Sequence, residues 1–162
     1  MKIEEKIKEK LNKEKIEFER IEYLAGDASS RKYFRLYQKG KCNVLMNTDE
    51  KNNTLKSFLI TTKLFKSLGI TVPKIYFSSV KNGFIILEDF GSNKYSKILK
   101  KSNQKALYKY ALDALIHLHK KKINNELKPY NKNLFFEESA LFFNWYLPLK
   151  GKKASKDHIE EF

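Results

Sequence analysis

Residues 32–46, KYFRLYQKGKCNVLM, decide the fold class of this sequence. Residues 32–38 and 42–46 are rich in the aromatic and aliphatic side chains that strands favour. Between them, Lys39-Gly40-Lys41 supplies the glycine and the polar neighbours of a tight hairpin turn. The stretch therefore predicts two strands joined by a short turn.

The chain before this hairpin predicts a helix and a further strand. Ile3, Ile7 and Leu11 recur at every fourth position through the charged residues 2–14, which is typical of a short amphipathic helix. Residues 16–24, IEFERIEYL, have the β-branched and aromatic content of a strand.

The chain after the hairpin predicts a helix and two more strands. Residues 54–68 carry apolar side chains at helical spacing, and Gly69 is typical of the end of a helix. Residues 72–77 and the fully apolar residues 84–87 are predicted strands, joined by a turn at residues 80–83.

Beyond Gly91 the pattern becomes helical. Apolar residues recur at helical spacing through residues 104–121. Residues 134–146 form an aromatic-rich segment that we also predict to be helical, and we expect Pro148 to end it.

This order of elements predicts an α+β fold, with five antiparallel strands, one helix after the third strand, and helices alone afterwards. The N-lobe of kinases and the start of their C-lobe have the same layout. By that analogy we expect residues 1–90 to form a kinase-like N-lobe with a nucleotide-binding loop. Residues 91–162 would then begin a helical C-lobe that is truncated before its catalytic loop.

The composition is strongly basic, with 33 lysine and arginine residues against 19 acidic residues and a net charge of +14. Such a charge makes nucleic acid and an anionic membrane candidate partners. Only Arg20, Arg31 and Arg35 are arginines, however, whereas dedicated nucleic-acid readers rely on arginine. We interpret the lysine excess as the codon bias of an AT-rich genome, and keep RNA binding, with Tyr33 and Phe34 as candidate stacking residues, as an alternative.

Several absences narrow the class of protein. Cys42 is the one cysteine, so no disulfide forms within the chain, and no signal peptide is visible. No apolar run reaches the roughly 18 residues that a membrane span needs. We therefore expect a cytoplasmic protein without a membrane partner.

A loop between the first two predicted strands is the first candidate binding segment. It runs through Gly26, Asp27, Ala28, Ser29, Ser30 and Arg31. Small residues let backbone N–H groups approach a polyphosphate, while serine hydroxyls and an arginine add donors and charge. The alternative is an ordinary tight hairpin loop, since the same residues are common in turns.

The end of the last predicted strand is the second candidate segment. The strand leads directly into Leu87, Glu88, Asp89 and Phe90, and then Gly91. The backbone of residues 88–90 can hydrogen-bond a flat heterocycle between apolar walls. The alternative is a strand end capped by a polar turn.

Five motifs in order resemble the aminoglycoside phosphotransferase and choline kinase-like family, and within it the bacterial kinases of anomeric N-acetylmuramate and N-acetylglucosamine. The resemblance covers nearly all of residues 16–147. The matching motifs are GDAS-x-R-x-YFR at Gly26 to Arg35, VLM at Val44 to Met46, P-x-I at Pro73 to Ile75, ILEDFG at Ile86 to Gly91, and E-x-x-LF-x-x-WYL at Glu138 to Leu147.

The resemblance implies transfer of the ATP γ-phosphoryl group to a sugar hydroxyl with Mg²⁺. The loop with Gly26 to Arg31 would cover the phosphates, and Leu87 to Phe90 would line the adenine pocket. Glu138 and Trp145 would contribute to the sugar side, although an aromatic helix can equally serve lobe packing. Choline, an aminoglycoside or homoserine are the other acceptors that the family suggests.

The sequence departs from the kinase pattern in two places. Met46 stands where kinases commonly carry a lysine, and residues 54–68 contain no acidic partner for one. We therefore hypothesise that Arg31 or Arg35 supplies the missing charge, so both join the predicted ATP site.

The catalytic H-x-D…N pattern is also missing, because His117, His119 and His158 lack the following Asp and Asn. We expect the catalytic residues and the Mg²⁺ ligands beyond Phe162, and a chain that binds nucleotide weakly and is inactive alone. A non-catalytic nucleotide- or RNA-binding module is the alternative function. The oligomeric state stays open, because exposed apolar residues 134–147 would favour self-association.

Overall fold

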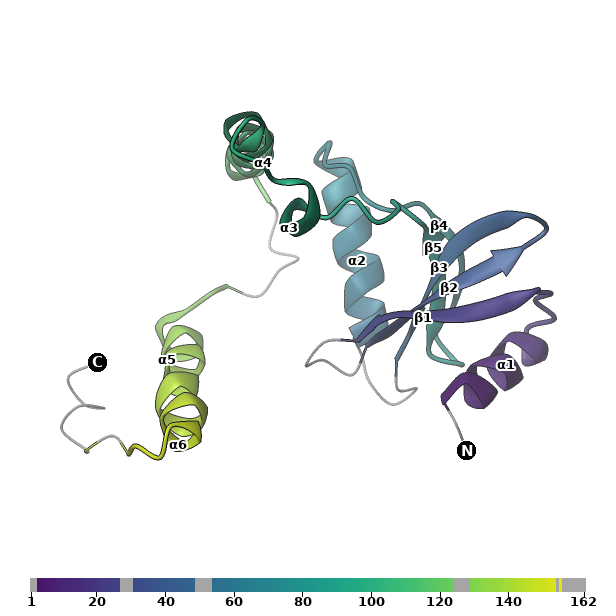
Figure 1. Cartoon of the computed structure of the whole chain (residues 1–162), viewed down its shortest axis with the longest axis horizontal. Coiled ribbons are helices and arrows are strands. Elements are labelled where there is room, and N and C mark those ends of the chain that lie inside the picture. Colours follow the sequence, from purple (N-terminus) through teal and green to yellow (C-terminus); the bar gives the residue numbers. More distant parts are fainter. Residues whose placement is uncertain (1–2, 27–30, 49–53, 124–128, 154, 156–162) are drawn as a thin grey trace. The chain divides into compact units, whose positions relative to one another are not determined.

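The computed structural model describes residues 3–26, 31–48, 54–123, 129–153 and 155. Its elements confirm an α+β fold with a five-stranded antiparallel sheet (Figure 1). In chain order they are α1 (Ile3–Lys13), β1 (Arg20–Gly26), β2 (Lys32–Gln38), β3 (Lys41–Asn47), α2 (Thr54–Ser67), β4 (Ile75–Ser79), β5 (Phe84–Glu88), α3 (Tyr95–Ile98), α4 (Gln104–His119), α5 (Lys132–Leu141), the π-helix η1 (Phe142–Tyr146) and α6 (Leu147–Leu149).

The sheet has the strand order β1-β2-β3-β5-β4, so β4 and β1 are its edges. The predicted hairpin of β2 and β3 is confirmed, with Phe34 opposite Leu45. Lys39 and Gly40 between them both have positive φ, 49° and 72°. Two successive positive φ angles match the right-handed twist of the strands, and they explain the glycine at this turn.

Alternating side chains give the sheet two apolar faces, each covered by one helix. On one face Phe34, Leu45 and Phe84 pack with Ile7 and Leu11 of α1. On the other face Met46, Ile85 and Leu87 pack with Leu55 of α2. Figure 1 shows the sheet between these two helices. The period-two pattern of the strands therefore decides which helix meets which side chain.

The first strand begins later than predicted, at Arg20 instead of residue 16. Lys15 has φ of 56°, and the N–H of Ile16 donates to the carbonyl of Leu11, so the chain turns sharply as α1 ends. Ile16 and Phe18 then pack against the α1 cluster instead of joining the sheet. These apolar side chains resemble those of a strand, but they anchor the connection between α1 and β1.

The region around Pro73 also differs from prediction. β4 starts at Ile75 and not at residue 72. Proline has no N–H to donate to a neighbouring strand, so pairing begins after it. The short helix α3 was not predicted from the sequence. The helix predicted at residues 54–68 is confirmed as α2, and Gly69 follows it with φ of 79°.

The aromatic segment near the C-terminus is helical, as predicted, but its limits were wrong. Helix α5 begins at Lys132, where the side chain of Asn131 accepts a hydrogen bond from the N–H of Leu134 at 2.9 Å. Helical turns continue through Pro148 to Leu149. The π-helical turn η1 shifts the hydrogen-bond register just before Pro148, which lies in the first turn of α6, where the lack of an N–H is tolerated.

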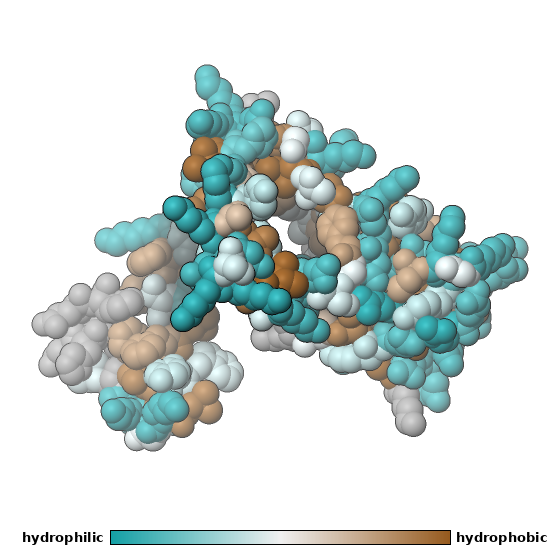
Figure 2. All heavy atoms as spheres, turned by 45° about the horizontal axis from the view of Figure 1, so that its top comes forward, coloured by the Kyte–Doolittle hydropathy of each residue, from teal (hydrophilic) through white to brown (hydrophobic). Residues whose placement is uncertain are grey.

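The chain divides into two compact units, residues 1–121 and residues 122–162. Helices α3 and α4 thus belong to the unit that contains the sheet. Within the described part of the chain, no helix is both long and apolar enough to span a membrane. The α4 and α5–α6 helices leave many large apolar side chains at the surface, and Figure 2 shows such brown patches among the hydrophilic residues.

Candidate functional site

A polar cluster joins β2 and β3 to the segment that follows β5. Arg35 Nε donates to Asp89 Oδ2 at 2.8 Å, and Arg35 Nη2 donates to Ser92 Oγ at 2.8 Å. Asp89 Oδ1 accepts from the backbone N–H of Gly91 at 2.7 Å. The Cys42 thiol completes the set, with Sγ 3.4 Å from Asp89 Oδ2. The cluster fixes the predicted adenine segment against the sheet.

The cluster keeps Asp89 ionised. Burial alone would raise the pKa of this carboxyl group, but the hydrogen bonds from Arg35 and from the Gly91 N–H outweigh it and lower the pKa below its usual value. Burial is also the main reason that the pKa of Cys42 is raised, and the neighbouring Asp89 carboxylate adds to that effect. A thiol held in its protonated form is a donor and not a nucleophile.

In the predicted adenine segment, only some backbone groups are free to hydrogen-bond a ligand. The N–H of Glu88 donates to the carbonyl of Lys74 at 2.8 Å, and the Glu88 carboxylate accepts from the Lys74 N–H at 3.0 Å. The side chain of Leu87 is buried in the α2-facing core. Phe90, in contrast, is 60% exposed, and its backbone groups bond to none of the described residues. A planar ligand would therefore meet this segment at Phe90.

The predicted phosphate loop is described at its two ends. Gly26 closes β1, where an added Cβ would come within 2.5 Å of Tyr23 Oη, so a larger residue would displace that ring. Arg31 is half-buried just before β2. Asp27, Ala28, Ser29 and Ser30 lie outside the described residues.

An apolar contact joins β3 to α2. Met46 of β3 is fully buried and packs in one cluster with Leu55 of α2. The third strand and the following helix are therefore held together by hydrophobic burial instead of charge.

The predicted sugar-side residues belong to the second unit. Glu138 of α5 accepts a hydrogen bond from Tyr130 Oη at 2.6 Å. That bond is the first cause of the raised pKa of Tyr130. Trp145 of η1 is 69% exposed. Both side chains are accessible on one helical segment.

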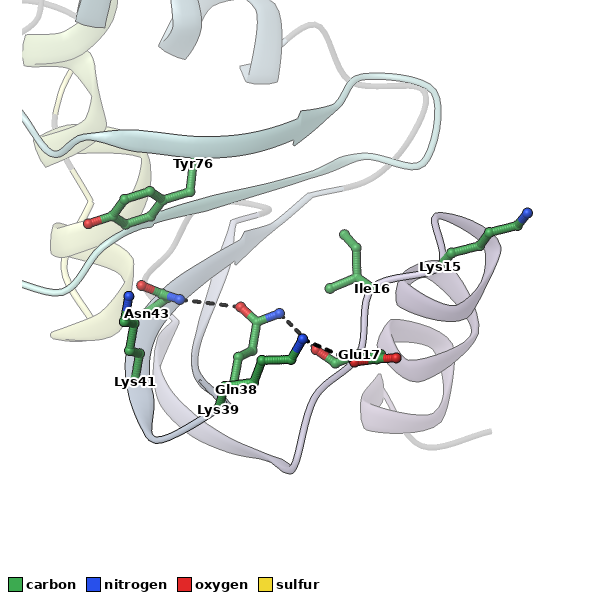
Figure 3. A pocket seen from close by; sticks show the side chains of 8 residues that line it. All are labelled: Lys15, Ile16, Glu17, Gln38, Lys39, Lys41, Asn43 and Tyr76. Atoms are coloured by element: carbon green, nitrogen blue, oxygen red, sulfur yellow. Dashed lines mark hydrogen bonds and ion pairs between the residues drawn. The ribbon is translucent and has the colours of Figure 1, made fainter.

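A concavity of about 720 Å³, whose lining contains none of these residues, lies between the β2–β3 hairpin, the segment after α1, and Tyr76 of β4 (Figure 3). Two of its polar side chains already form hydrogen bonds within the lining. Gln38 Nε2 donates to the Glu17 carbonyl at 2.8 Å, and Asn43 Nδ2 donates to Gln38 Oε1 at 3.2 Å. We interpret these hydrogen bonds as structural contacts that join the hairpin to the segment after α1, and we do not assign a ligand to the concavity.

Two other expectations bear on metal and RNA. In the described ranges, no three His, Cys, Asp or Glu side chains gather where they could hold a metal ion. Phe34, a candidate for stacking on bases, is fully buried under α1 and is not available for that role.

Sequence reasoning missed Ser92 and the role of Cys42 in the polar cluster. Their signal lay in the strand order, because Arg35 and Cys42 meet residues 89–92 only when β3 lies between β2 and β5. No spacing along the chain reveals that arrangement.

No model of a known protein family matches the sequence. It is similar to curated proteins named N-acetylmuramate/N-acetylglucosamine kinase from three bacteria. Identity is 32% over 123 residues for the protein of Pseudomonas aeruginosa, 30% over 123 residues for that of Pseudomonas putida, and 26% over 132 residues for that of Neisseria meningitidis. The alignments cover 76%, 76% and 78% of this chain but 36%, 36% and 39% of the relatives. The chain thus spans little more than a third of the length of the curated relatives it matches.

Proposed function

We propose that this chain is the nucleotide-binding part of a sugar kinase, which transfers the γ-phosphoryl group of ATP to a hydroxyl of an N-acetylated amino sugar such as N-acetylmuramate or N-acetylglucosamine. The observation that carries the proposal is the 32% identity over 123 residues with a protein named as such a kinase. The five-stranded sheet, with a helix between its third and fourth strands, supports a kinase-like N-lobe.

In this proposal residues 1–90 are the nucleotide-binding lobe and residues 91–162 begin the helical lobe. Residues 26–31 cover the phosphates, and Arg31 contributes the positive charge that phosphoryl transfer needs. Arg35 is already bonded to Asp89 and Ser92, so it acts by orienting the segment that meets the adenine. Phe90 supplies the free backbone groups and an exposed ring beside them. Glu138 and Trp145 are proposed for the sugar side.

We assign neither the magnesium ligands nor the proton acceptor of phosphoryl transfer to residues of this chain. The described residues form no metal-ligand cluster, and the sequence contains no H-x-D…N pattern. We therefore assign no chemical step to this chain, and we place those groups in residues outside its sequence. Its own contribution is to bind and orient ATP.

Two measurements test the proposal. Titration of the chain with ATP, followed by ligand-observed NMR, should give weak saturable binding that ADP displaces, without phosphorylation of N-acetylmuramate. Absence of ATP binding would remove the nucleotide role, and phosphorylation by these 162 residues would refute the assignment of catalysis to residues outside them. Reading the native coding sequence past codon 162 should reveal an H-x-D…N loop followed by an aspartate; a stop codon there would leave a non-catalytic binding module.

A further inference from the structure

A second concavity, of about 560 Å³, lies between α2 and the chain that leads into β4. We name it the α2–β4 groove. One wall is a stripe of α2 formed by Leu59, Thr62, Lys63 and Lys66, whose spacing of three and four places them on one helix face. The other wall is the run of residues 70–75. None of the residues assigned to the nucleotide or the sugar lines this groove.

The lining of the groove is mainly apolar. The aliphatic side chains and the proline are half-buried, so each leaves part of its surface open to a ligand. A volume of this size falls within the range of roughly 300–1,000 Å³ that is usual for ligand sites. The apolar lining consists of Leu59, Ile70, Val72, Pro73 and Ile75.

Positive charge surrounds this apolar lining. Lys63, Lys66 and Lys74 are exposed, and the groove has no acidic residue. Among the described residues, no carboxylate forms an ion pair with any of these lysines. Lys74 Nζ lies instead 5.6 Å from the ring centre of Tyr76. The groove therefore favours a ligand that carries both apolar groups and negative charge.

One wall also offers free backbone groups. The N–H of Ile70 donates to the carbonyl of Phe65, and the N–H of Lys74 donates to the Glu88 carboxylate. Between them, the N–H groups of Thr71 and Val72 bond to none of the described residues. This wall continues into β4, an edge strand of the sheet. Unpaired backbone beside an edge strand is what an extended peptide uses to add itself to a protein.

We propose that the α2–β4 groove docks an acidic, apolar peptide segment of a partner protein. Apolar side chains of the peptide fill the lining, its carboxylates meet the three lysines, and its main chain pairs along residues 71–72. A second copy of this chain is disfavoured because each copy carries a net charge of +14. Nucleic acid is disfavoured because the groove has neither an aromatic side chain for base stacking nor an arginine.

The test uses a short synthetic fluorescein-labelled peptide in which glutamate alternates with leucine and phenylalanine, and fluorescence anisotropy at about 0.15 M salt. We expect saturable binding. The double variant Lys63→Glu/Lys66→Glu should weaken it at least about tenfold, because the charge of one wall is reversed. Thr71→Glu, on the opposite wall, should also weaken it. The matched control Lys6→Glu/Lys8→Glu changes exposed lysines of α1 by the same charge and should leave the affinity unchanged.

Specificity is tested with two further ligands. A peptide with serine in place of leucine and phenylalanine should bind at least about tenfold more weakly, since it cannot use the apolar lining. A DNA oligonucleotide of equal charge should not displace the labelled peptide. The proposal is overturned by equal affinity for the α1 and α2 charge variants, by equal affinity for the serine peptide, by displacement with the oligonucleotide, or by no saturable binding up to about 1 mM peptide. Circular dichroism of each variant checks that the fold is kept.

Discussion

Arg35 on β2 and Asp89 after β5 are 54 positions apart in sequence and form a hydrogen-bonded ion pair of 2.8 Å. The Asp89 side chain is only 11% exposed, and the Gly91 N–H and Cys42 thiol bond to the same carboxylate. A partly buried pair with several hydrogen bonds is better protected from solvent than a surface pair. Asp89 is therefore the structural link between the sheet and the chain that leaves it.

Replacing Asp89 by asparagine should lower the melting temperature of the chain by about 3 °C or more. The variant keeps the shape of the side chain but removes the charge that Arg35 faces. The control is Asp113→Asn, which removes an exposed ion pair with Lys109 on α4. That change should shift the melting temperature by no more than about 1 °C, since exposed pairs contribute little. Equal shifts in the two variants would show that the Asp89 cluster adds no special stability.

The lowered pKa of Asp89 predicts a pH dependence of stability. A carboxyl group whose folded pKa lies below its unfolded value, near about 4, stabilises the fold fully above that unfolded pKa. The contribution is lost as pH falls through the folded pKa. The difference in melting temperature between the wild type and Asp89→Asn should therefore be constant from about pH 6 to pH 5 and shrink toward pH 3. A difference that grows on acidification would contradict the assignment.

The strands and the long helices of the sheet-containing unit could be predicted because local pattern and tertiary role agree there. Phe34 and Leu36 alternate with Tyr33, Arg35 and Tyr37, and the same alternation puts them under α1. Ile16 and Phe18 misled the prediction because packing on α1, which lies earlier in the chain, decides their conformation. The predicted end of the last helix, before Pro148, was wrong because a π-helical turn has no distinctive residue pattern.

The sequence predicts which two segments form the candidate site, but it does not predict the contacts between their side chains. The resemblance of Gly26 to Arg35 and of Ile86 to Gly91 to kinase motifs selects both segments along the chain. The bond of Arg35 to Asp89 depends on strand order, and no sequence pattern supplied it. The same holds for the α2–β4 groove, whose two walls come from a helix and a loop that each look ordinary alone.

Leu11 of α1 tests whether the N-terminal helix belongs to the core of the sheet. Its side chain is completely buried against the sheet. Leu11→Ala should reduce the free energy of unfolding by about 2–5 kcal/mol, the usual cost of such a truncation in a core. Leu149→Ala, at a side chain that is 82% exposed, is the matched control and should be nearly neutral. Denaturant titration gives both values, and a neutral Leu11→Ala would mean that α1 is only loosely attached.

The end of α2 is held by a contact with α4. His117 Nε2 lies 2.8 Å from the carbonyl oxygen of Leu68, and a Cβ on Gly69 would come within 3.3 Å of the same nitrogen. Gly69→Ala should therefore destabilise the chain more than Gly40→Ala. Both glycines have positive φ, but a Cβ on Gly40 would meet no other atom within 4 Å. Thermal melts of the two variants separate the contact from the backbone strain that they share.

Adding His117→Ala to both glycine variants completes that comparison. With His117→Ala present, Gly69→Ala should destabilise the chain no more than Gly40→Ala does, because the imidazole ring that the new Cβ would crowd is gone. If the excess persists in the double variants, the contact between α2 and α4 does not exist in solution.

Arg31 and Arg35 are predicted to have different roles in nucleotide binding, and affinities for ATP and adenosine distinguish them. Arg31→Ala should weaken ATP and ADP binding by about tenfold, because a charge facing a phosphate is lost. It should leave the binding of adenosine, which has no phosphate, unchanged. Arg35→Ala should weaken the binding of ATP and of adenosine equally, because it loosens the segment of Asp89 that orients Phe90.

Arg20→Ala, which removes an exposed pair with Glu22 on β1, is the control and should change neither affinity. Ligand-observed NMR of the three variants measures these affinities. Unaltered ATP affinity in both the Arg31 and Arg35 variants would show that neither arginine replaces the lysine absent at Met46, and the search for the phosphate-binding charge would move to the lysines of this chain.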